Sequence, residues 1–197
     1  MHELIARADH IIFDIGNVLL SFQPQWILDR MVPRDLHALF LRSVFGSPLW
    51  LCLDLGTLDY HDAARMMCGQ ESALAPHHDL VLELLHGFPA VMKPLPPVQL
   101  MQPLRAMGKR IYLLSNFHRQ SYETVLQHHR FLGEVDGAVI SCYEQCIKPG
   151  ARIYNRLLTR FGIDRAKAVF LDDMHDNVRT ARRLGIPAIH YDGCSEL

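Results

Sequence analysis

Five side chains with complementary chemistry lie at or near the ends of short apolar runs, namely Asp14, Ser115, Lys148, Asp172 and Asp173. Three carboxylates brought together would raise one another's pKa values unless a cation neutralised them, and oxygen ligands with room for water suit Mg²⁺. A serine hydroxyl and the backbone N–H groups after it can hold an anion at a helix start. A lysine adds a positive charge that binds phosphate. Together these groups indicate phosphoryl transfer to an aspartate.

Taken one at a time, these residues have ordinary structural explanations. A strand-end aspartate is often a turn or capping residue, and Asp172-Asp173 could simply cap the next helix. Lys148 alone is typical of a solvated surface charge, and Ser115-Asn116 of a turn. Their joint occurrence, in order and at successive strand ends, favours the chemical interpretation.

The apolar runs that position these residues are typical of buried strands. They cover residues 10–14, 110–115, 137–141, 168–172 and 187–191, and their continuous hydrophobicity is typical of parallel strands covered on both faces. Amphipathic helices are predicted at 97–107, 119–129, 151–161 and 175–184. The alternation predicts an α/β fold: a Rossmann-like parallel sheet with flanking helices. Ligands of such sheets bind at the carboxyl ends of the strands, where the polar residues would meet.

Residues 22–93 interrupt this alternation. They contain no convincing strand, but amphipathic helical stretches at 24–31, 34–44, 58–67 and 77–85, with turns predicted at 32–33, 46–48, 56–57 and 69–76. The prolines at 89, 94, 96 and 97 are interpreted as the return to the sheet. We therefore expect a helical-bundle cap domain, 22–93, inserted into an α/β core domain made of 1–21 and 94–197.

The composition is that of an ordinary globular protein. The chain has 197 residues, 49% hydrophobic and 21% charged, with a formal net charge of −1. The lack of a basic cluster argues against nucleic acid or an anionic membrane as partner, and no apolar run is long enough to span a bilayer. Five scattered cysteines (Cys52, Cys68, Cys142, Cys146, Cys194) without a C-x-x-C pair predict reduced thiols and a cytoplasmic location. The oligomeric state is left open.

The joint pattern resembles the haloacid dehalogenase (HAD) superfamily, in the subclass with a helical cap after motif one (C1). Residues 13–19, Phe-Asp-Ile-Gly-Asn-Val-Leu, resemble motif one, with the nucleophile at Asp14. Leu114-Ser-Asn116 resembles motif two, Ile147-Lys-Pro149 motif three, and residues 170–177, Phe-Leu-Asp-Asp-Met-His-Asp-Asn, motif four. The resemblance covers nearly the whole chain, and 22–93 falls where the subclass carries its cap.

The resemblance implies a Mg²⁺ site and a role for each ligand. Asp14 would be phosphorylated and would also bind the metal. Asp173 would be the main motif-four ligand, with Asp172 supporting the metal directly or through water. The backbone carbonyl of Gly16 would supply a further ligand, whatever its side chain.

The resemblance also implies that Ser115, the amide of Asn116 and Lys148 hold the transferring phosphoryl group of a small-molecule substrate. One departure matters: many family phosphatases carry a second aspartate where this chain has Gly16. That acid protonates the leaving group, a contribution of roughly 10²–10⁴ in rate. Some relatives with the D-x-G-N-V motif are nonetheless phosphatases that act on sugar 1-phosphates, whose anomeric hydroxyl is a more acidic leaving group. We therefore expect a phosphatase for a small phosphate monoester such as an aldose 1-phosphate.

Other residues are weaker candidates for the site. His118 and His175 could substitute for the missing acid, although most of the chain's histidines must be incidental. Cap histidines at 61, 77, 78 and 86 could touch the substrate, and Trp26, Phe45, Trp50 and Tyr60 could line a sugar pocket, but aromatics at helical spacing are more often core.

Two alternative functions are kept. A dehalogenase would use Asp14 on carbon without a metal, which suits the missing acid. It leaves Asp172-Asp173 unexplained, and the aromatic residue usual two positions after a dehalogenase nucleophile is absent. A non-catalytic binding module would retain the metal site but not hydrolysis.

Overall fold

A five-stranded parallel sheet forms the centre of the computed structural model, which describes residues 3–193. The strands are β1 (His10–Phe13), β2 (Arg110–Ser115), β3 (Gly137–Ile140), β4 (Ala168–Asp172) and β5 (Ala188–His190). Their order is β3-β2-β1-β4-β5, so β1 lies between β2 and β4 at the switch in strand order. The predicted α/β fold is confirmed, and the carboxyl ends of β1, β2 and β4 adjoin.

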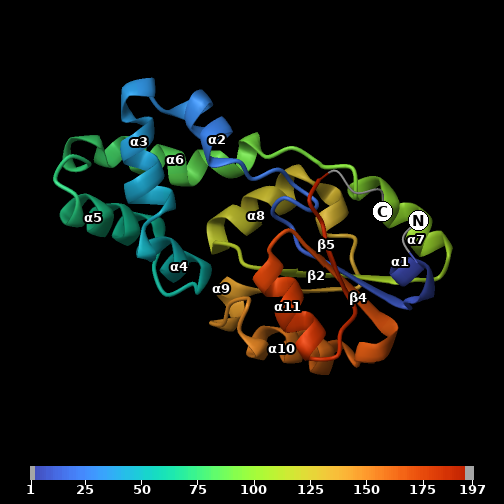
Figure 1. The fold of residues 1–197 in the computed structure, drawn as a ribbon. Coiled ribbons are helices and arrows are strands. Elements are labelled where there is room, and N and C mark those ends of the chain that lie inside the picture. Colours follow the sequence, from blue (N-terminus) through green and yellow to red (C-terminus); the bar gives the residue numbers. More distant parts are fainter. Residues whose placement is uncertain (1–2, 194–197) are drawn as a thin grey trace.

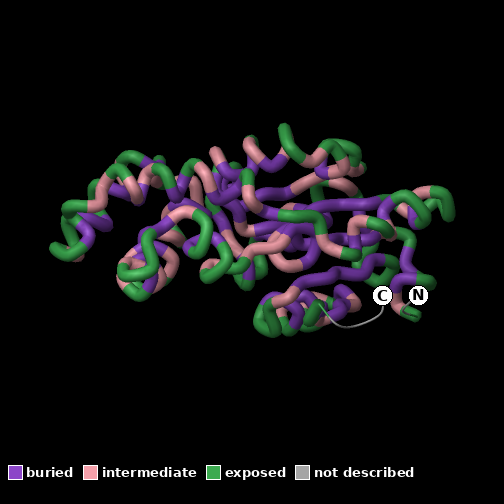
Figure 2. The backbone as a smooth tube through the Cα atoms, turned by 90° about the horizontal axis from the view of Figure 1, so that it is seen from above, coloured by how far each residue is buried: buried purple, intermediate pink, exposed green. Residues whose placement is uncertain are grey.

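Both faces of the sheet are covered by helices, as continuous apolar strands require. Ile11 and Phe13 of β1 belong to one apolar layer, together with side chains of α1 (Glu3–Arg7), α7 (Val98–Ala106) and α8 (Arg119–His128). Ile12 points into the second layer, with α10 (Ala151–Phe161) and α11 (His175–Arg183). The strands accordingly run through the buried interior in Figure 2.

The chain between β1 and α7 is helical and stands beside the sheet (Figure 1). It contains α2 (Pro24–Met31), α3 (His37–Phe40), α4 (Pro48–Asp54), α5 (Tyr60–Gln70) and α6 (His78–Val91). The larger hydrophobic cluster runs from β1 and β2 into these helices without interruption, and α6 packs against α8. The two linkers pair through their backbones where the segment leaves and returns, with Ser21 N donating to Lys93 O at 2.8 Å.

Most predicted elements are present with small shifts at their ends, but three short α-helices among residues 3–193 were not predicted. These are α1, α4 and α9 (Ser141–Glu144). The predicted turn at 46–48 is present at Gly46 and Ser47 and leads directly into α4. Ser47 caps this helix by accepting a hydrogen bond from Leu49 N, and Pro48 occupies its first turn.

Three further details differ from the sequence-based expectations. Gly69 lies inside α5 and Pro89 inside α6, because both helices extend past the predicted breakers. The predicted helix 34–44 divides into a tight turn (Arg34–Leu36), α3 and a wider π-type turn (Leu41–Phe45).

Two further expectations bear on the chain as a whole. The cysteines among the described residues are free thiols, and Cys194 lies outside those residues. Within 3–193 no single helix is long and apolar enough to cross a membrane; the bent pair Arg34–Phe45 and Pro48–Asp54 reaches that length and composition together.

Candidate active site

Asp14 follows directly on the central strand β1 and is buried. Its Oδ1 accepts hydrogen bonds from Ile15 N at 2.7 Å and Ser115 Oγ at 2.6 Å. Lys148 Nζ lies 2.8 Å from the same oxygen. The parallel pairing of β1 with β2 places Ser115, the last residue of β2, beside Asp14. Three donors thus converge on one oxygen of this carboxylate.

Lys148 joins Asp14 to Asp172 in a buried ion cluster. Its Nζ donates to Asp172 Oδ2 at 2.6 Å, and both side chains are almost completely inaccessible to solvent. Asp172 also accepts hydrogen bonds from Met174 N and from the Asn177 amide at 2.8 Å each. These contacts engage both oxygens of Asp172, so this carboxylate holds the amine of Lys148 in place beside Asp14.

Asp173 is the partly exposed member of the acidic group. Its Oδ2 accepts a hydrogen bond from Asn17 Nδ2 at 3.2 Å, and Asn17 in turn accepts one from Phe22 N at 2.9 Å. Asn17 has φ 54, a left-handed conformation that asparagine tolerates better than most residues. The motif-one loop therefore holds Asp173 by a side chain that the sequence interpretation assigned no role.

Asp14, Asp172 and Asp173 could together hold a cation, because one oxygen from each lies within 4.8 Å of the others. Burial raises the pKa of Asp14 to about 7, Lys148 opposes this, and Asp172 and Asp173 add to it. Burial likewise raises the pKa of Asp173. Such mutual repulsion, with hard oxygen donors, fits a divalent cation of the Mg²⁺ type.

Lys148 stays charged in spite of its burial. Burial alone would lower the pKa of its amine, but the carboxylates of Asp14 and Asp172 outweigh that effect and raise the pKa. The amine is therefore a permanent positive charge beside Asp14.

Asn116 and Gly16 have different surroundings from those of the charged residues. The Asn116 side chain exchanges two hydrogen bonds with the backbone of Lys148: Nδ2 donates to the carbonyl at 3.0 Å and Oδ1 accepts from the N–H at 2.8 Å. It thus holds the Lys148 loop in place. Gly16 borders the cavity, and a Cβ added there would meet no atom within 4 Å.

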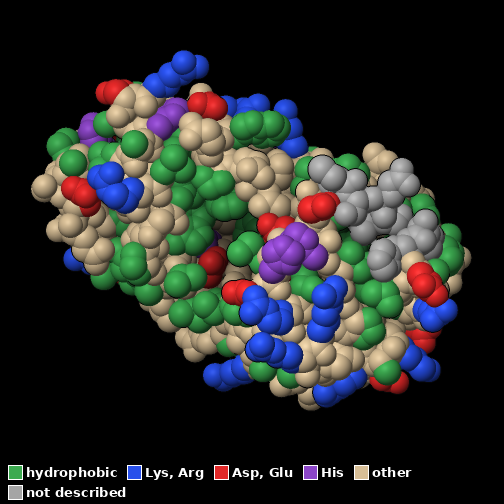
Figure 3. All heavy atoms as spheres, viewed as in Figure 1, with side chains coloured by type: hydrophobic (Ala, Val, Ile, Leu, Met, Phe, Trp, Pro, Cys, Tyr) green, Lys and Arg blue, Asp and Glu red, His purple; other side chains and the backbone are tan. Residues whose placement is uncertain are grey.

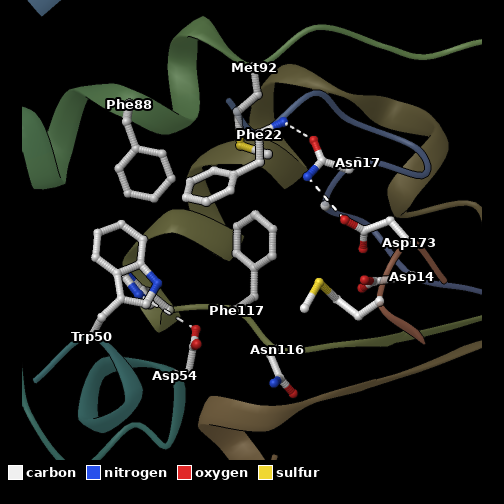
Figure 4. A pocket seen from close by; sticks show the side chains of 13 residues that line it. Asp14, Asn17, Phe22, Trp50, Asp54, Phe88, Met92, Asn116, Phe117 and Asp173 are labelled. Atoms are coloured by element: carbon white, nitrogen blue, oxygen red, sulfur yellow. Dashed lines mark hydrogen bonds and ion pairs between the residues drawn. The ribbon is translucent and has the colours of Figure 1, made fainter. Parts of the chain in front are cut away.

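A cavity of about 360 Å³ opens above these groups. Its lining residues come from the sheet edge and from the inserted helices: Asp14, Gly16, Asn17, Phe22, Trp50, Asp54, Phe88, Met92, Asn116, Phe117, His118, Asp173 and Met174. Figure 4 shows the aromatic side chains gathered on one side and Asp14 with Asp173 on the other. On the surface, hydrophobic and acidic side chains surround the hollow between the two parts of the molecule (Figure 3).

The weaker candidates divide between the cavity and other places. Trp50 and His118 line the cavity. Tyr60 is buried and hydrogen-bonded to Ser121, Trp26 is 53% exposed and borders a different hollow, and His175 stacks on His190. Phe45 packs against Phe22 and Trp50 behind the lining, and none of His61, His77, His78 and His86 borders this cavity.

Sequence reasoning missed two polar lining residues, Asn17 and Asp54, and the apolar lining residues Phe22, Phe88, Met92, Phe117 and Met174. Asp54 lies in α4, which was not predicted. The capped start Ser47-Pro48 was the signal that could have located that helix and its C-terminal acid.

The chain belongs to the haloacid dehalogenase-like hydrolase family, whose model matches residues 8–185. The expected membership is thereby confirmed, and the protein is a hydrolase of this family.

Two curated proteins are similar over nearly the whole chain. The sesquiterpene phosphatase astK of Aspergillus oryzae is 23% identical over 180 residues, which cover 91% of this chain and 87% of that protein. Acyl-CoA dehydrogenase family member 10 of Mus musculus is 29% identical over 192 residues, 92% of this chain. The chain spans only 18% of the length of the mouse protein.

Solved structures share the fold. The HAD family enzyme bt-2542 of Bacteroides thetaiotaomicron, which has been crystallised with magnesium and inorganic phosphate, matches with a TM-score of 0.73, 16% identity and 96% coverage of both chains. The L-2-haloacid dehalogenase of Xanthobacter autotrophicus matches with a TM-score of 0.61 and 14% identity, over 92% of this chain and 76% of that one.

Proposed function

We propose that this protein is a Mg²⁺-dependent phosphatase that hydrolyses a small phosphate monoester through a phosphoaspartate on Asp14. The observation that carries the proposal is the convergence of Ser115 and Lys148 on Asp14 Oδ1 at 2.6 and 2.8 Å, beside the carboxylates of Asp172 and Asp173. A buried carboxylate between a permanent cation and a metal-binding group is suited to attack a phosphorus atom.

The phosphoryl group would be bound by residues that already surround Asp14. Lys148 would neutralise charge on the phosphoryl oxygens, and the Ser115 hydroxyl and the backbone N–H of Asn116 would donate hydrogen bonds to them. Since Asn116 fixes the Lys148 backbone through two hydrogen bonds, it would also orient the Lys148 amine. The Ser115 hydroxyl would turn from Asp14 Oδ1 to make its bond, while Ile15 N and Lys148 Nζ would still occupy Oδ1 and leave Oδ2 as the attacking atom.

Asp14, Asp173 and the backbone carbonyl of Gly16 would hold Mg²⁺, and Asp172 would act mainly through Lys148 and Asn177. When bound, Mg²⁺ neutralises phosphoryl oxygens and so favours attack by a carboxylate. The two motif-four aspartates differ in their hydrogen bonds and in their access to the cavity, and this difference supports the assignment. Asp172 is enclosed by donors, whereas Asp173 borders the cavity.

The cavity lining bears on the nature of the leaving group. The sequence-based expectation is an aldose 1-phosphate, but the hydroxyls of a sugar need polar partners when they leave water. Phe22, Trp50, Phe88 and Phe117 offer instead an apolar wall. We therefore add a second candidate, a phosphate ester of an apolar alcohol, in keeping with the sesquiterpene phosphatase among the similar proteins.

We further propose that residues 22–93 form a cap domain over a core of 1–21 and 94–197, and that cap movement admits the substrate. The pairing of the two linkers at Ser21 and Lys93 supports these boundaries. The cytoplasmic location and the absence of nucleic-acid and membrane partners stay predictions from the sequence.

The first prediction is that Asp14→Asn abolishes phosphatase activity. Its amide is nearly the same size but cannot act as a nucleophile, so turnover should fall by roughly 10⁴-fold or more. Phosphate release would be measured with Mg²⁺ over a panel of aldose 1-phosphates, prenyl-type phosphates and 4-nitrophenyl phosphate.

The same panel separates the alternatives. EDTA should abolish phosphate release; halide release from a 2-haloacid in EDTA would indicate a dehalogenase instead. Tight binding of the phosphate esters without turnover would indicate a binding module. Equal turnover by the variant and the parent would contradict the phosphoaspartate mechanism.

A further inference from the structure

Asp54 is the last residue of α4, and its side chain lines the same cavity as Asp14 although it comes from the inserted helices (Figure 4). It is only 8% exposed. Position 16, where many family phosphatases carry their acid, has no side chain here. Of the residues that line the cavity, Asp14 and Asp173 belong to the proposed metal group, which leaves Asp54 as the carboxyl group without a role.

We propose that Asp54 is the general acid–base of this enzyme, supplied by the inserted helices in place of the missing acid at position 16. The inference rests on the proposed phosphatase function. It assigns to Asp54 the protonation of the leaving group and the later activation of water.

A general acid must be protonated when the substrate binds, and the surroundings of Asp54 favour this. Burial, with a further contribution from the negative charge of Asp14, raises the pKa of Asp54 to about 7, and the positive charge of Lys148 opposes the effect. Tyr60 of α5 and Cys142 of α9 also face this region, and both have raised pKa values and stay neutral. A carboxyl group that titrates near neutral pH can donate and accept a proton in one cycle.

His118 lies beside Asp54, with Nε2 3.5 Å from Asp54 Oδ1. Burial lowers the pKa of this imidazole to about 3, so it is neutral and cannot serve as the acid. Its Nδ1 lies 3.4 Å from the Tyr60 hydroxyl. If that hydroxyl donates to Nδ1, the proton of the ring is on Nε2, which makes no hydrogen bond in the described chain and has Asp54 Oδ1 as its nearby charged neighbour. His118 is thus a neutral positioning residue that packs beside Asp54.

The backbone of Asp54 is fixed to the sheet side of the molecule. The Ser141 hydroxyl, which is completely buried, donates to Asp54 O at 2.6 Å and accepts from Phe117 N at 3.0 Å. One hydroxyl therefore ties the end of α4 to the segment that carries Phe117 and His118. Two residues further on, Gly56 lies so close to Cys142 that an added Cβ would be 2.2 Å from its carbonyl oxygen. The acid is held at a defined position relative to Asp14.

The chemistry balances with Asp54 alone as proton carrier. In the first step an Asp14 oxygen bonds to phosphorus, the bond from phosphorus to the ester oxygen breaks, and the Asp54 proton passes to that oxygen, which releases the alcohol. In the second step the Asp54 carboxylate takes a proton from water while the water oxygen bonds to phosphorus. The bond from phosphorus to Asp14 breaks, inorganic phosphate leaves, and Asp54 is protonated again.

The test compares leaving groups in Asp54→Asn and the parent. An alkyl phosphate, such as 3-phenylpropyl phosphate, needs the acid, so its turnover should fall by roughly 10²–10⁴-fold. 4-Nitrophenyl phosphate needs no proton to leave, so the variant should release a rapid burst of nitrophenolate equal to the enzyme concentration, followed by slow turnover. An equal loss with both esters and no burst, or no loss with either, would overturn the proposal.

A second variant restores an acid at the usual place. Because a side chain at position 16 meets open space, Asp54→Asn/Gly16→Asp should recover at least a tenth of the parent's activity on the alkyl ester. If Asp54→Asn does not fold, the parent alone decides: its rate should depend weakly on leaving-group basicity, and a steep dependence contradicts an acid. Loss of all activity, including the burst, in Asp14→Asn but not in Asp54→Asn separates this inference from the proposed function.

Discussion

At the scale of single residues, Lys148 is the side chain on which the acidic group depends. Its amine contacts both Asp14 and Asp172 in an environment almost closed to water. Removing one partner of a buried ion pair leaves an uncompensated charge, which destabilises far more than the loss of a surface pair. The same amine is the positive charge that we propose for phosphoryl binding, so stability and activity share one group.

We predict that Lys148→Met lowers the free energy of unfolding at neutral pH by about 3–5 kcal/mol in the absence of metal. It should also lower turnover by roughly 100-fold or more, because charge on the phosphoryl group is no longer neutralised. Urea unfolding and steady-state kinetics measure the two effects. Lys167→Met is the matched control, because Lys167 is exposed and its Nζ lies 3.8 Å from Asp9 Oδ2. Its loss should change the free energy of unfolding by about 0.5 kcal/mol or less.

At the scale of elements, the junction between α4 and α9 decides where Asp54 lies. Gly56 has φ +68, and any side chain there would overlap the Cys142 backbone. Ser141 adds the hydroxyl that bridges Asp54 and Phe117. A close backbone approach and one buried hydroxyl thus connect an inserted helix to the end of β3.

We predict that Gly56→Ala destabilises the protein by about 2–5 kcal/mol, the sum of a left-handed backbone with a Cβ and of steric overlap. Gly162→Ala is the matched control, since Gly162 has φ +61 but nothing within 4 Å of the added Cβ. It should cost only about 1–2 kcal/mol. Urea unfolding compares the two, and equal losses would mean that the contact with Cys142 contributes nothing.

Local sequence patterns predicted the sheet well and the inserted helices less completely. Residues 110–115 and 168–172 coincide with β2 and β4, because a buried parallel strand has a continuous apolar signature. α4 has only seven residues, too few for a clear helical period. The short helix and its last residue, Asp54, were therefore missed. That Asp54 shares a cavity with Asp14 could not be predicted either, because it depends on packing between segments far apart in the chain.

The charged side chains of the site followed a simpler rule. Asp14, Ser115 and the pair Asp172-Asp173 end or directly follow adjacent strands, so the sheet topology alone brings them together. The positions of the aromatic side chains that line the cavity cannot be predicted from the sheet topology in this way. Phe22 and Phe88 lie at opposite ends of the inserted segment and meet only in the folded protein, with ring centroids 5.7 Å apart.

At the scale of the whole molecule, buried carboxyl groups make stability depend on pH and on metal. Burial raises the pKa values of Asp14 and Asp54 to about 7 and also raises that of Asp173. The folded state therefore binds these protons more tightly than the unfolded chain does. This contribution to stability is fully present below the unfolded pKa and is lost as the pH rises through the folded pKa.

We predict that these carboxyl groups together lower the unfolding free energy of the metal-free protein by on the order of a few kcal/mol between about pH 4 and about pH 7, while the lowered pKa of His118 acts in the opposite direction. Mg²⁺ should restore stability more at the upper end of this range than at the lower end, because it binds the carboxylate form. Urea unfolding in EDTA and in Mg²⁺ at both ends measures the effect. Between the two ends of this range in EDTA, the unfolding free energy should fall less, or rise more, in Asp14→Asn than in the parent, and an equal change in both proteins would contradict the account.

Trp50 and Asp54 lie one helical turn apart on α4, and both line the cavity. One short helix therefore presents both a recognition surface and an ionisable group, and a single insertion or deletion within it would displace the two together. During evolution, a change in α4 that altered which alcohol groups fit the cavity would therefore also alter the rate at which those alcohols leave.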